Sequence, residues 1–484
     1  MSLKDKTVTG ISWSFVESIA RSGISFIFGI IMARLLSPRE FGLVGMTTFF
    51  VAFSQPFIIS GLSQALVRKL HCTQEDYSTV FFFNLATSIT AYIILFFTAG
   101  AISSFFNEPQ LILILRVLSL TIVINSVSLV QMVILTKKID FKLLTKITII
   151  STVCAGVIAI FLAYLGFGVW SLVIKHLIIS TLSMLLLLYW NRWRPSLLFS
   201  WQSFKEMYSF GWKLMVSGLL NTVQVNIFKL VIGKYYTASD LGFYTRAEMF
   251  KKIPAENITR VIQRVSYPVL SSIQDEKNRL KANYRKLIKS TMLITLVSML
   301  SLAAVARPLI ITLIGEQWLP SVLYLQLLCF VGIFFPLIAI NANMMQVQGR
   351  SDLILKINIL RKILLIPVVI IGIIYGISSM IIGLIIESLI AYFLYSYWSG
   401  KMIGYTSVHQ IKDIVPSFLL ASTVGIFVFL IGHFLQASPI VTLIMQVLVF
   451  IGASLAITEV FKMEDYLFLK GIVMEKVFQR FKQT

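Results

Sequence analysis

Charged residues are scarce in this sequence, and their scarcity excludes an ordinary soluble protein. Only 13% of the 484 residues are Asp, Glu, Lys or Arg, whereas a soluble globular protein carries about 25%. Hydrophobic residues make up 57% of the chain, and the mean hydropathy is +0.86. This composition is typical of a polytopic membrane protein.

Residues that usually carry chemistry are scarce as well. The three cysteines, Cys72, Cys154 and Cys329, are odd in number and widely spaced, so they indicate neither a disulfide framework nor a metal site. The four histidines form no cluster with metal-ligand spacing. The sequence has no glycine-rich loop suited to phosphate, and the loops expected outside the cell hold no carboxylate pair. We therefore expect no enzyme activity, no cofactor and no ATP-driven transport by this chain alone.

Apolar segments long enough to cross a bilayer follow one another along the whole chain. One crossing needs about 20 apolar residues, and windows of that length predict about fourteen helices. The expected spans cover residues 10–34, 40–64, 78–104, 110–134, 145–166, 168–189, 208–233, 240–268, 287–314, 320–345, 354–374, 377–399, 411–434 and 439–460. The first span contains Glu17 and Arg21 and is followed by others, so we interpret it as a span and not as a cleaved signal.

Basic residues outnumber acidic ones by 42 to 21, and their distribution predicts the orientation of the chain. Nucleic-acid binding could explain a net charge of +21, but the basic residues gather in alternate loops, as in membrane proteins with positive cytoplasmic loops. The loops expected inside, with the two ends of the chain, hold Lys4, Lys6, Arg68, Lys69, Lys137, Lys138, Lys142, Lys146, Arg192, Arg194, Lys205, Lys277, Arg279, Lys281, Arg285, Lys286, Lys289, Arg350, Lys401, Lys412, Lys462, Lys470, Lys476, Arg480 and Lys482. The outside connections hold Arg34, Arg39 and Lys234 and almost no other basic residue. We expect both termini in the cytoplasm and no nucleic-acid partner.

Two hinges with matching sequence predict an internal repeat. Residues 37–42 read Ser-Pro-Arg-Glu-Phe-Gly, and residues 237–242, 200 positions later, read Thr-Ala-Ser-Asp-Leu-Gly. In each hinge a hydroxyl residue precedes an acid by three positions, which is the spacing of a capping box at the start of a helix. The alternative is that apolar helices joined by Ser/Pro/Gly turns look alike without being related.

The repeat predicts how the spans are grouped. Six spans, an even number, separate the starts of the two halves, so both halves enter the membrane in the same direction. We expect an all-α fold of two six-helix bundles related by a pseudo-two-fold axis along the membrane normal, with a cavity between them. The predicted divisions are an N-terminal lobe over 1–205, a C-terminal lobe over 206–400, and two additional helices with a basic cytoplasmic tail over 401–484.

Ionisable and polar side chains inside the spans predict where a substrate binds. A charge at the bilayer centre costs about 2.5–3.5 kcal/mol or more, so such residues usually face a hydrated cavity or a partner. The candidate substrate-binding residues are Arg21, Lys213, Asn221, Gln224, Arg246, Arg260 and Arg264, and the candidates for ion coupling are Glu17, Asp240 and Glu256. Because Arg and Lys predominate, and Arg forms paired hydrogen bonds with phosphate, an anionic ligand is favoured.

Structural explanations stay open for each group. Glu17 with Arg21, four residues apart in the first span, could be a structural ion pair between helices. Lys213 could extend to the membrane interface. Arg260 and Arg264 could be cytoplasmic anchors of their span.

At this point the sequence resembles a known family. The resemblance is carried by Gly10, Trp13, Glu17, the run Ala33–Leu43, the run Leu241–Ala247, Pro254, Val265, Tyr267 and Pro268. These residues resemble the polysaccharide-transport flippases of the multidrug/oligosaccharidyl-lipid/polysaccharide exporter superfamily, in the branch that includes colanic-acid exporters. The resemblance implies a V-shaped transporter that works by alternating access, with a fold like that of multidrug exporters and lipid II flippases.

The resemblance also implies a substrate. It would be an oligosaccharide linked to undecaprenyl diphosphate, such as an O-antigen, capsule or exopolysaccharide repeat unit, moved across the bacterial inner membrane. In lipid II flippases of the superfamily, arginines of the first helices and of helix 8 contact the diphosphate, and Arg21 and Arg260 are the counterparts by helix and depth. The implied partners are membrane lipids, a polysaccharide polymerase and chain-length machinery, and the implied energy source is a proton or sodium gradient.

Two other functions remain as alternatives. A cation-coupled multidrug antiporter of the same fold would be expected to have an acidic cavity, whereas the candidates here are mainly basic. A membrane polysaccharide polymerase or glycosyltransferase would be expected to present large outside loops with catalytic acids or arginines, which the sequence lacks.

Overall fold

A computed structural model describes residues 3–59, 61–435, 437–463, 465–467 and 470–471, and all regular structure in these residues is helical. The chain divides into two compact units, Met1–Thr245 and Arg246–Thr484, and helix α10 crosses the boundary. The all-α prediction is confirmed for the described residues. The predicted lobes 1–205 and 206–400 and the segment 401–484 stay predictions, because compact packing units need not coincide with sequence repeats.

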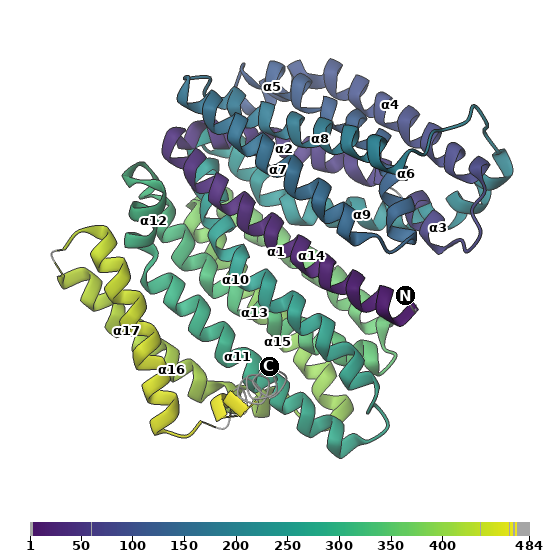
Figure 1. Cartoon of the computed structure of the whole chain (residues 1–484). Coiled ribbons are helices and arrows are strands. Elements are labelled where there is room, and N and C mark those ends of the chain that lie inside the picture. The colour runs from purple at the N-terminus through teal and green to yellow at the C-terminus, as the bar shows by residue number, and fades with distance from the viewer. Residues whose placement is uncertain (1–2, 60, 436, 464, 468–469, 472–484) are drawn as a thin grey trace, which may run out of the picture. The chain divides into compact units, whose positions relative to one another are not determined.

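In its described residues, the first unit contains nine helices and the start of a tenth (Figure 1). These are α1 (Leu3–Leu35), α2 (Pro38–Ile59), α3 (Leu62–Arg68), α4 (Gln74–Phe106), α5 (Leu111–Leu118), α6 (Leu120–Lys137), α7 (Phe141–Tyr164), α8 (Val169–Asn191), α9 (Trp201–Tyr235) and α10 (Ala238–Ser271). The second unit holds the rest of α10 and the helices that follow it. These are α11 (Lys277–Ala304), α12 (Ala306–Ile314), the 3-10 turn η1 (Glu316–Trp318), α13 (Ser321–Val347), α14 (Ser351–Tyr375), α15 (Ile377–Ile403), α16 (Ser407–Phe434) and α17 (Pro439–Val460).

Twelve helical segments among the described residues are long and apolar enough to cross a membrane. They correspond to twelve of the expected spans, with α5 and α6 together forming one. The other two expected spans are also helical but are not among the twelve. Many side chains of α1 lie outside the described residues, and the many charged residues of α10 lower its hydropathy. The predicted inside charges Lys4, Lys6, Lys476, Arg480 and Lys482 have side chains outside the described residues.

The fourth expected span is interrupted at Ser119, between α5 and α6. The Ser119 hydroxyl donates to the Arg116 carbonyl (3.1 Å), and the Thr121 hydroxyl donates to the Leu118 carbonyl (2.6 Å). Hydroxyls that bond backbone carbonyls compete with the helix ladder. Such bonds also occur within unbroken helices of this protein, so they do not account for the interruption, which hydropathy alone did not predict.

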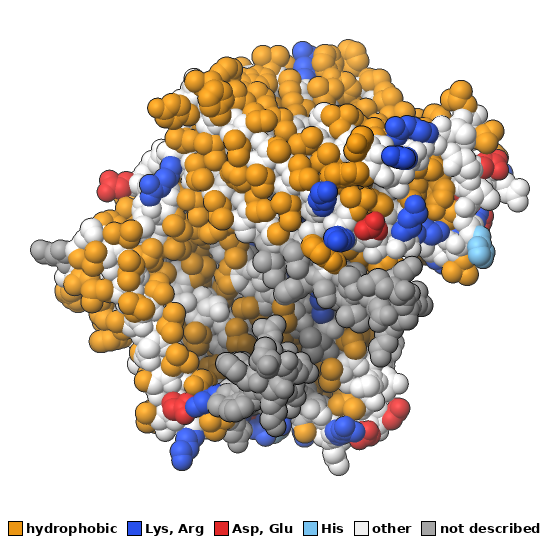
Figure 2. Space-filling view, viewed as in Figure 1, with side chains coloured by type: hydrophobic (Ala, Val, Ile, Leu, Met, Phe, Trp, Pro, Cys, Tyr) orange, Lys and Arg blue, Asp and Glu red, His pale blue; other side chains and the backbone are white. Residues whose placement is uncertain are grey.

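Both units expose apolar side chains, as membrane-spanning bundles do. On the face in Figure 2, hydrophobic side chains cover much of the first unit and form patches on the second, and Lys and Arg side chains lie in smaller groups. Phe97 and Phe161 in the first unit and Ile366 and Ile426 in the second are each at least 59% exposed. Large exposed apolar surfaces of this kind fit contact with lipid.

The capping box predicted at Thr237 forms in full, and at Ser37 the half in which the acid accepts from the preceding hydroxyl residue forms. The Glu40 carboxylate accepts hydrogen bonds from the Ser37 backbone N–H (2.6 Å) and hydroxyl (3.0 Å). The Asp240 carboxylate accepts the same two bonds from Thr237, whose hydroxyl oxygen accepts from the Asp240 N–H (3.1 Å). Each box satisfies amide groups at the start of its helix, α2 or α10.

The two hinges also contact each other reciprocally within the first unit. A Cβ atom at Gly42 would collide with the Ala238 carbonyl oxygen, and a Cβ atom at Gly242 would collide with the Pro38 carbonyl oxygen. The partners are equivalent positions of the repeat, since Pro38 matches Ala238 and Gly42 matches Gly242. A reciprocal contact of this kind is what a local two-fold relation produces. The backbones approach so closely because both glycines lack a side chain.

The reciprocal contact predicts a selective response to alanine. Gly42→Ala and Gly242→Ala should each lower the free energy of unfolding by about 1–3 kcal/mol, because the added methyl meets backbone. Gly100→Ala is the matched control, since nothing lies within 4 Å of a Cβ atom built there. Thermal unfolding of the purified variants in lipid nanodiscs measures the difference. Equal unfolding temperatures for Gly42→Ala and Gly100→Ala would contradict the contact.

Candidate functional site

Helix α9 presents three of the predicted substrate-binding residues. It begins after Ser200, whose hydroxyl oxygen accepts from the Ser203 N–H (3.2 Å). Lys213 and Asn221 are exposed, and Gln224 is half-buried. Their spacings of eight and three residues place them on one side of a helix. The structure therefore brings these three predicted residues together in one polar stripe.

The opposite side of α9 packs closely against the end of α2 and the start of α3. A Cβ atom on Gly211 would lie 2.8 Å from the Gly61 carbonyl carbon, and one on Gly218 would lie 3.3 Å from the Pro56 Cβ. Such approaches leave little freedom for the helix to rotate. The packing thus keeps the stripe of Lys213, Asn221 and Gln224 directed away from α2.

Helix α1 places Glu17 and Arg21 in different surroundings. Arg21 is exposed, whereas Glu17 is half-buried and accepts a hydrogen bond from the Thr148 hydroxyl of α7 (3.4 Å). Among the described contacts none joins Glu17 to Arg21. The structure thus gives no support to the ion-pair interpretation of these two residues, and it leaves Arg21 accessible to a ligand.

Asp240 has a structural role. Its carboxylate caps α10 through the two hydrogen bonds from Thr237 described above. This capping accounts for an acid at that position without ion coupling.

The second unit holds the predicted residues of α10. Arg246 is half-buried, whereas Arg260 and Arg264 are exposed. Arg260 forms an ion pair with Glu256 one turn earlier (2.9 Å), and both side chains are more than a third exposed. A pair so exposed contributes about 0–1 kcal/mol. An anionic ligand could therefore displace Glu256 from Arg260 at little cost.

Lys251 explains part of the high charge of α10. It is 4% exposed, and its Nζ lies 4.5 Å from the centre of the Phe335 ring in α13. A cation over an aromatic face is stabilised by the ring's charge distribution. Lys251 therefore belongs to the interior of the second unit, and the exposed cations of α10 are Arg260 and Arg264.

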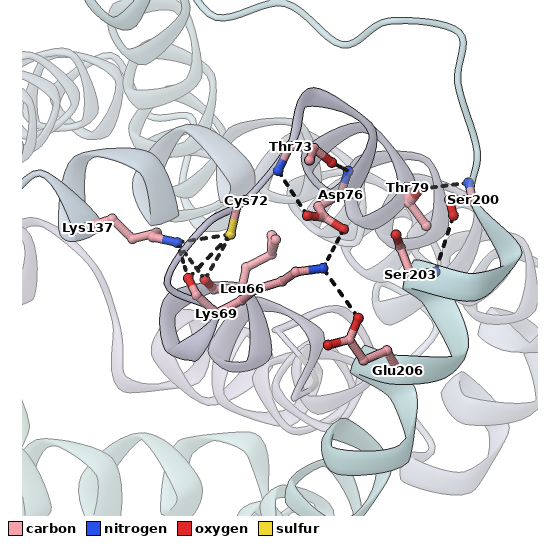
Figure 3. A network of polar contacts seen from close by, with 10 residues as sticks. All are labelled: Leu66, Lys69, Cys72, Thr73, Asp76, Thr79, Lys137, Ser200, Ser203 and Glu206. Carbon is pink, nitrogen blue, oxygen red and sulfur yellow. Dashed lines mark hydrogen bonds and ion pairs between the residues drawn. The ribbon is translucent and has the colours of Figure 1, made fainter.

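A polar network missed by the sequence analysis joins α3, α4 and α9 in the first unit (Figure 3). Lys69 Nζ lies between two carboxylates, 3.0 Å from Asp76 Oδ1 and 3.3 Å from Glu206 Oε2. Asp76 is 1% exposed and also caps α4 in a capping box with Thr73. The hydrogen bond to Asp76 raises the pKa of Lys69, so the lysine stays charged at neutral pH.

The same network extends to α6. Lys137 Nζ donates to the Leu66 carbonyl (3.1 Å), to the Lys69 carbonyl and to Cys72 Sγ (2.9 Å) (Figure 3). These bonds satisfy carbonyls at the end of α3 that have no partner in their own helix. Two lysines interpreted as loop charges therefore fix the connection between α3 and α4.

One part of this network could have been found from the sequence. Thr73 and Asp76 have the same spacing as the two capping boxes of the hinges. The other contacts join distant residues. Lys69 and Glu206 are separated by 137 positions in the sequence, and Lys137 is at least 65 positions from the loop that it contacts, so no local pattern predicts these contacts.

Comparison with known proteins identifies the family. The model of the family described as "Polysaccharide biosynthesis protein" matches residues 31–323, which is more than half of the chain. The chain belongs to this family. The match confirms the resemblance to polysaccharide-transport proteins noted in the sequence.

Curated relatives of this family member come from several bacteria. The succinoglycan biosynthesis transport protein ExoT of Rhizobium meliloti is 31% identical over 318 residues, covering 65% of this chain and 64% of ExoT. The lipopolysaccharide biosynthesis protein WzxC of Escherichia coli is 24% identical, covering 77% of this chain and 76% of WzxC. The teichuronic acid biosynthesis protein TuaB of Bacillus subtilis is 25% identical, covering 73% of each chain.

Solved structures share the fold. The lipid II flippase MurJ in an inward closed conformation matches with a TM-score of 0.76 at 15% identity, covering 94% of this chain and 98% of MurJ. An inward-facing multidrug resistance MATE family transporter matches with a TM-score of 0.62 at 18% identity, covering 82% and 98%. At these identities the likeness concerns the fold alone, and it confirms the predicted fold class.

The network in Figure 3 predicts unequal effects for its two ion pairs. Lys69→Met should lower the free energy of unfolding by about 1–3 kcal/mol, because it leaves the buried Asp76 carboxylate without its cation. Glu206→Gln should cost less than about 1 kcal/mol, because Glu206 is 64% exposed.

Thermal unfolding in nanodiscs at neutral pH compares these two variants. The pKa of Lys69 is raised above 10.5, so wild-type Lys69 is fully charged at neutral pH. The stability that Lys69→Met loses should therefore be largest there, and the loss should shrink only as the pH rises above 10.5 and wild-type Lys69 is deprotonated. A Glu206→Gln variant less stable than Lys69→Met would contradict this assignment.

Proposed function

We propose that the protein is a flippase that moves oligosaccharide linked to undecaprenyl diphosphate across the bacterial inner membrane. The cargo would be a repeat unit of O-antigen, capsule or exopolysaccharide, and the mechanism would be alternating access. The observation that carries the proposal is the family match over residues 31–323. It is supported by relatives named for the biosynthesis of three different polysaccharides, one of them a transport protein.

The chemistry of the exposed cations agrees with such a substrate. Arg21 and Lys213 are exposed on helices that are otherwise mainly apolar, and Arg264 is exposed on α10, which carries many charged residues. A cation in that position is unfavourable against lipid and favourable against water or an anion. A lipid-linked diphosphate offers an anionic head, while its polyprenyl tail can stay in the bilayer.

We assign roles to the predicted residues within this proposal. Arg21, Arg260 and Arg264 would bind the diphosphate, since a guanidinium pairs with phosphate oxygens through two parallel hydrogen bonds. Arg246 would be a further substrate contact, nearer the start of α10. Lys213, Asn221 and Gln224 would contact the glycan, because amide and ammonium groups can bond sugar hydroxyls.

Energy coupling and orientation are part of the same proposal. We propose that both termini lie in the cytoplasm and that a proton or sodium gradient drives the cycle. Of the three coupling candidates, Asp240 caps α10 and Glu256 pairs with Arg260, whereas Glu17 makes one long hydrogen bond to Thr148. Glu17 is therefore our first candidate for the coupling carboxylate.

Deletion of the gene followed by extraction of lipid-linked oligosaccharides tests the proposal in cells. We expect one diphosphate-linked repeat unit to accumulate on the cytoplasmic leaflet, and its mass would identify the glycan. Drug sensitivity without accumulation would favour a multidrug antiporter instead. Glycan synthesis by the purified protein would favour a polymerase or glycosyltransferase.

The proposed diphosphate site predicts a loss of transport without a loss of folding. Arg21→Ala and Arg264→Ala should each lower the rate of flipping about tenfold or more, because a charge-assisted hydrogen bond to phosphate contributes about 1.5–3 kcal/mol. Arg279→Ala is the matched control, since Arg279 is an exposed arginine that pairs with Glu276 outside the predicted site. Complementation of the deletion strain at equal protein levels gives the readout. Wild-type export by Arg21→Ala would remove Arg21 from the site.

A further inference from the structure

A pocket of about 490 Å³ lies in the first unit where three connections meet. Its walls come from the hinge before α2, from the start of α5 and from the connection between α7 and α8. The ion pair between Arg39 and Glu108 (2.8 Å) joins two of these connections. The volume is within the range of about 300–1,000 Å³ found for small-molecule sites.

The pocket lining combines aromatic rings with polar groups. Phe167 and Trp170 supply the rings, and Arg39, Glu40 and Gln110 supply the polar side chains. Among the described contacts, the indole N–H of Trp170 has no hydrogen-bond partner. An aromatic face beside donors and acceptors suits a ligand that is apolar on one face and polar at its edge.

The charge of the pocket distinguishes between ligand classes. Arg39 is neutralised by Glu108, and Glu40 adds a negative charge, so the lining carries no excess of cations. A phosphate group would have no unpaired cation to bind there. An acyl chain would cover the Gln110 amide and Oε1 of Glu40 without bonding to them, at a cost in free energy. A neutral polyhydroxylated ring avoids both penalties.

The pocket wall is also shaped by the capping box of the hinge. Glu40 uses Oε2 to cap α2 through Ser37, which fixes its carboxylate. A Cβ atom at Gly168 would collide with Oε1 of Glu40, so glycine is needed for the connection between α7 and α8 to pass beside the carboxylate. Gly168 also has φ +53°, which favours glycine. The part of the polar edge that Glu40 forms is therefore built into the fold.

We infer that this pocket is a binding site for a sugar ring of the transported glycan, distinct from the predicted diphosphate site. This inference rests on the proposed function, because it takes the glycan as the sugar's source. Trp170 stacks on the apolar face of the ring, and Gln110 and Arg39 bond its hydroxyls. The connections that form the pocket are those predicted to lie outside the cell, so the site receives the sugar head as it leaves.

Saturation-transfer NMR with methyl glycosides tests the site directly. The protein is held in lipid nanodiscs, because maltoside detergents themselves carry sugar rings. The probes are methyl glycosides of neutral hexoses and of N-acetylhexosamines, each measured with and without inorganic phosphate. We expect saturation of the sugar C–H protons by the wild-type protein, with no displacement by phosphate.

Three variants locate the binding. Trp170→Ala should weaken binding about tenfold, and Gln110→Ala should weaken it less. Tyr164→Ala is the matched control, since Tyr164 is an 80% exposed aromatic residue at the end of α7 that does not line the pocket. Tyr164→Ala should bind as the wild type does, and similar unfolding temperatures would show that the variants are folded.

Several results would overturn the inference. The first is that no glycoside shows saturation transfer, and the second is that Trp170→Ala and the wild type show equal saturation transfer. The third is that phosphate displaces the glycoside, which would indicate an anion site. Flipping of lipid-linked oligosaccharide is measured separately on the same preparations. Sugar binding without flipping would contradict the proposed flippase function but support the sugar site in the pocket. Flipping without sugar binding would support the flippase function and contradict the sugar site.

Discussion

The close approach of the two hinges is the constraint on which the first unit depends. Pro38 and Gly42 contact Ala238 and Gly242 through backbone, and the two capping boxes hold the hinge conformations that allow it. The same carboxylate that caps α2 forms part of the wall of the sugar pocket. The hinge at residues 37–42 thus affects three features: the start of α2, the contact between the two repeats and the shape of the pocket.

Glycine also determines how the polar residues of α9 are displayed. Because Gly211 and Gly218 let α9 pack closely on its neighbours, the stripe of Lys213, Asn221 and Gln224 remains accessible. Lys69 and Lys137, by contrast, are held by carboxylates and carbonyls and serve the structure. The unit thus separates cations with partners in the fold from cations available to a ligand.

Local features were predictable from the sequence, and features formed by distant residues were not. The boxes at Ser37 and Thr237 depend on a spacing of three, so the sequence analysis predicted both. The repeat predicted that the hinges are related, but not that Gly42 and Gly242 face each other's carbonyls. For Asp240 the sequence allowed both a helix cap and a coupling carboxylate, and the structure shows the bonds of the cap.

Reconstituted flipping is the most direct test of the central claim. Proteoliposomes would carry a fluorescent undecaprenyl-diphosphate oligosaccharide, and a membrane-impermeant quencher would report which leaflet holds it. The account predicts that wild-type protein makes substrate from the inner leaflet accessible to the quencher and that Arg21→Ala protein does so about tenfold more slowly or worse. If inner-leaflet substrate becomes accessible to the quencher equally with wild-type protein and in protein-free liposomes, the account is contradicted.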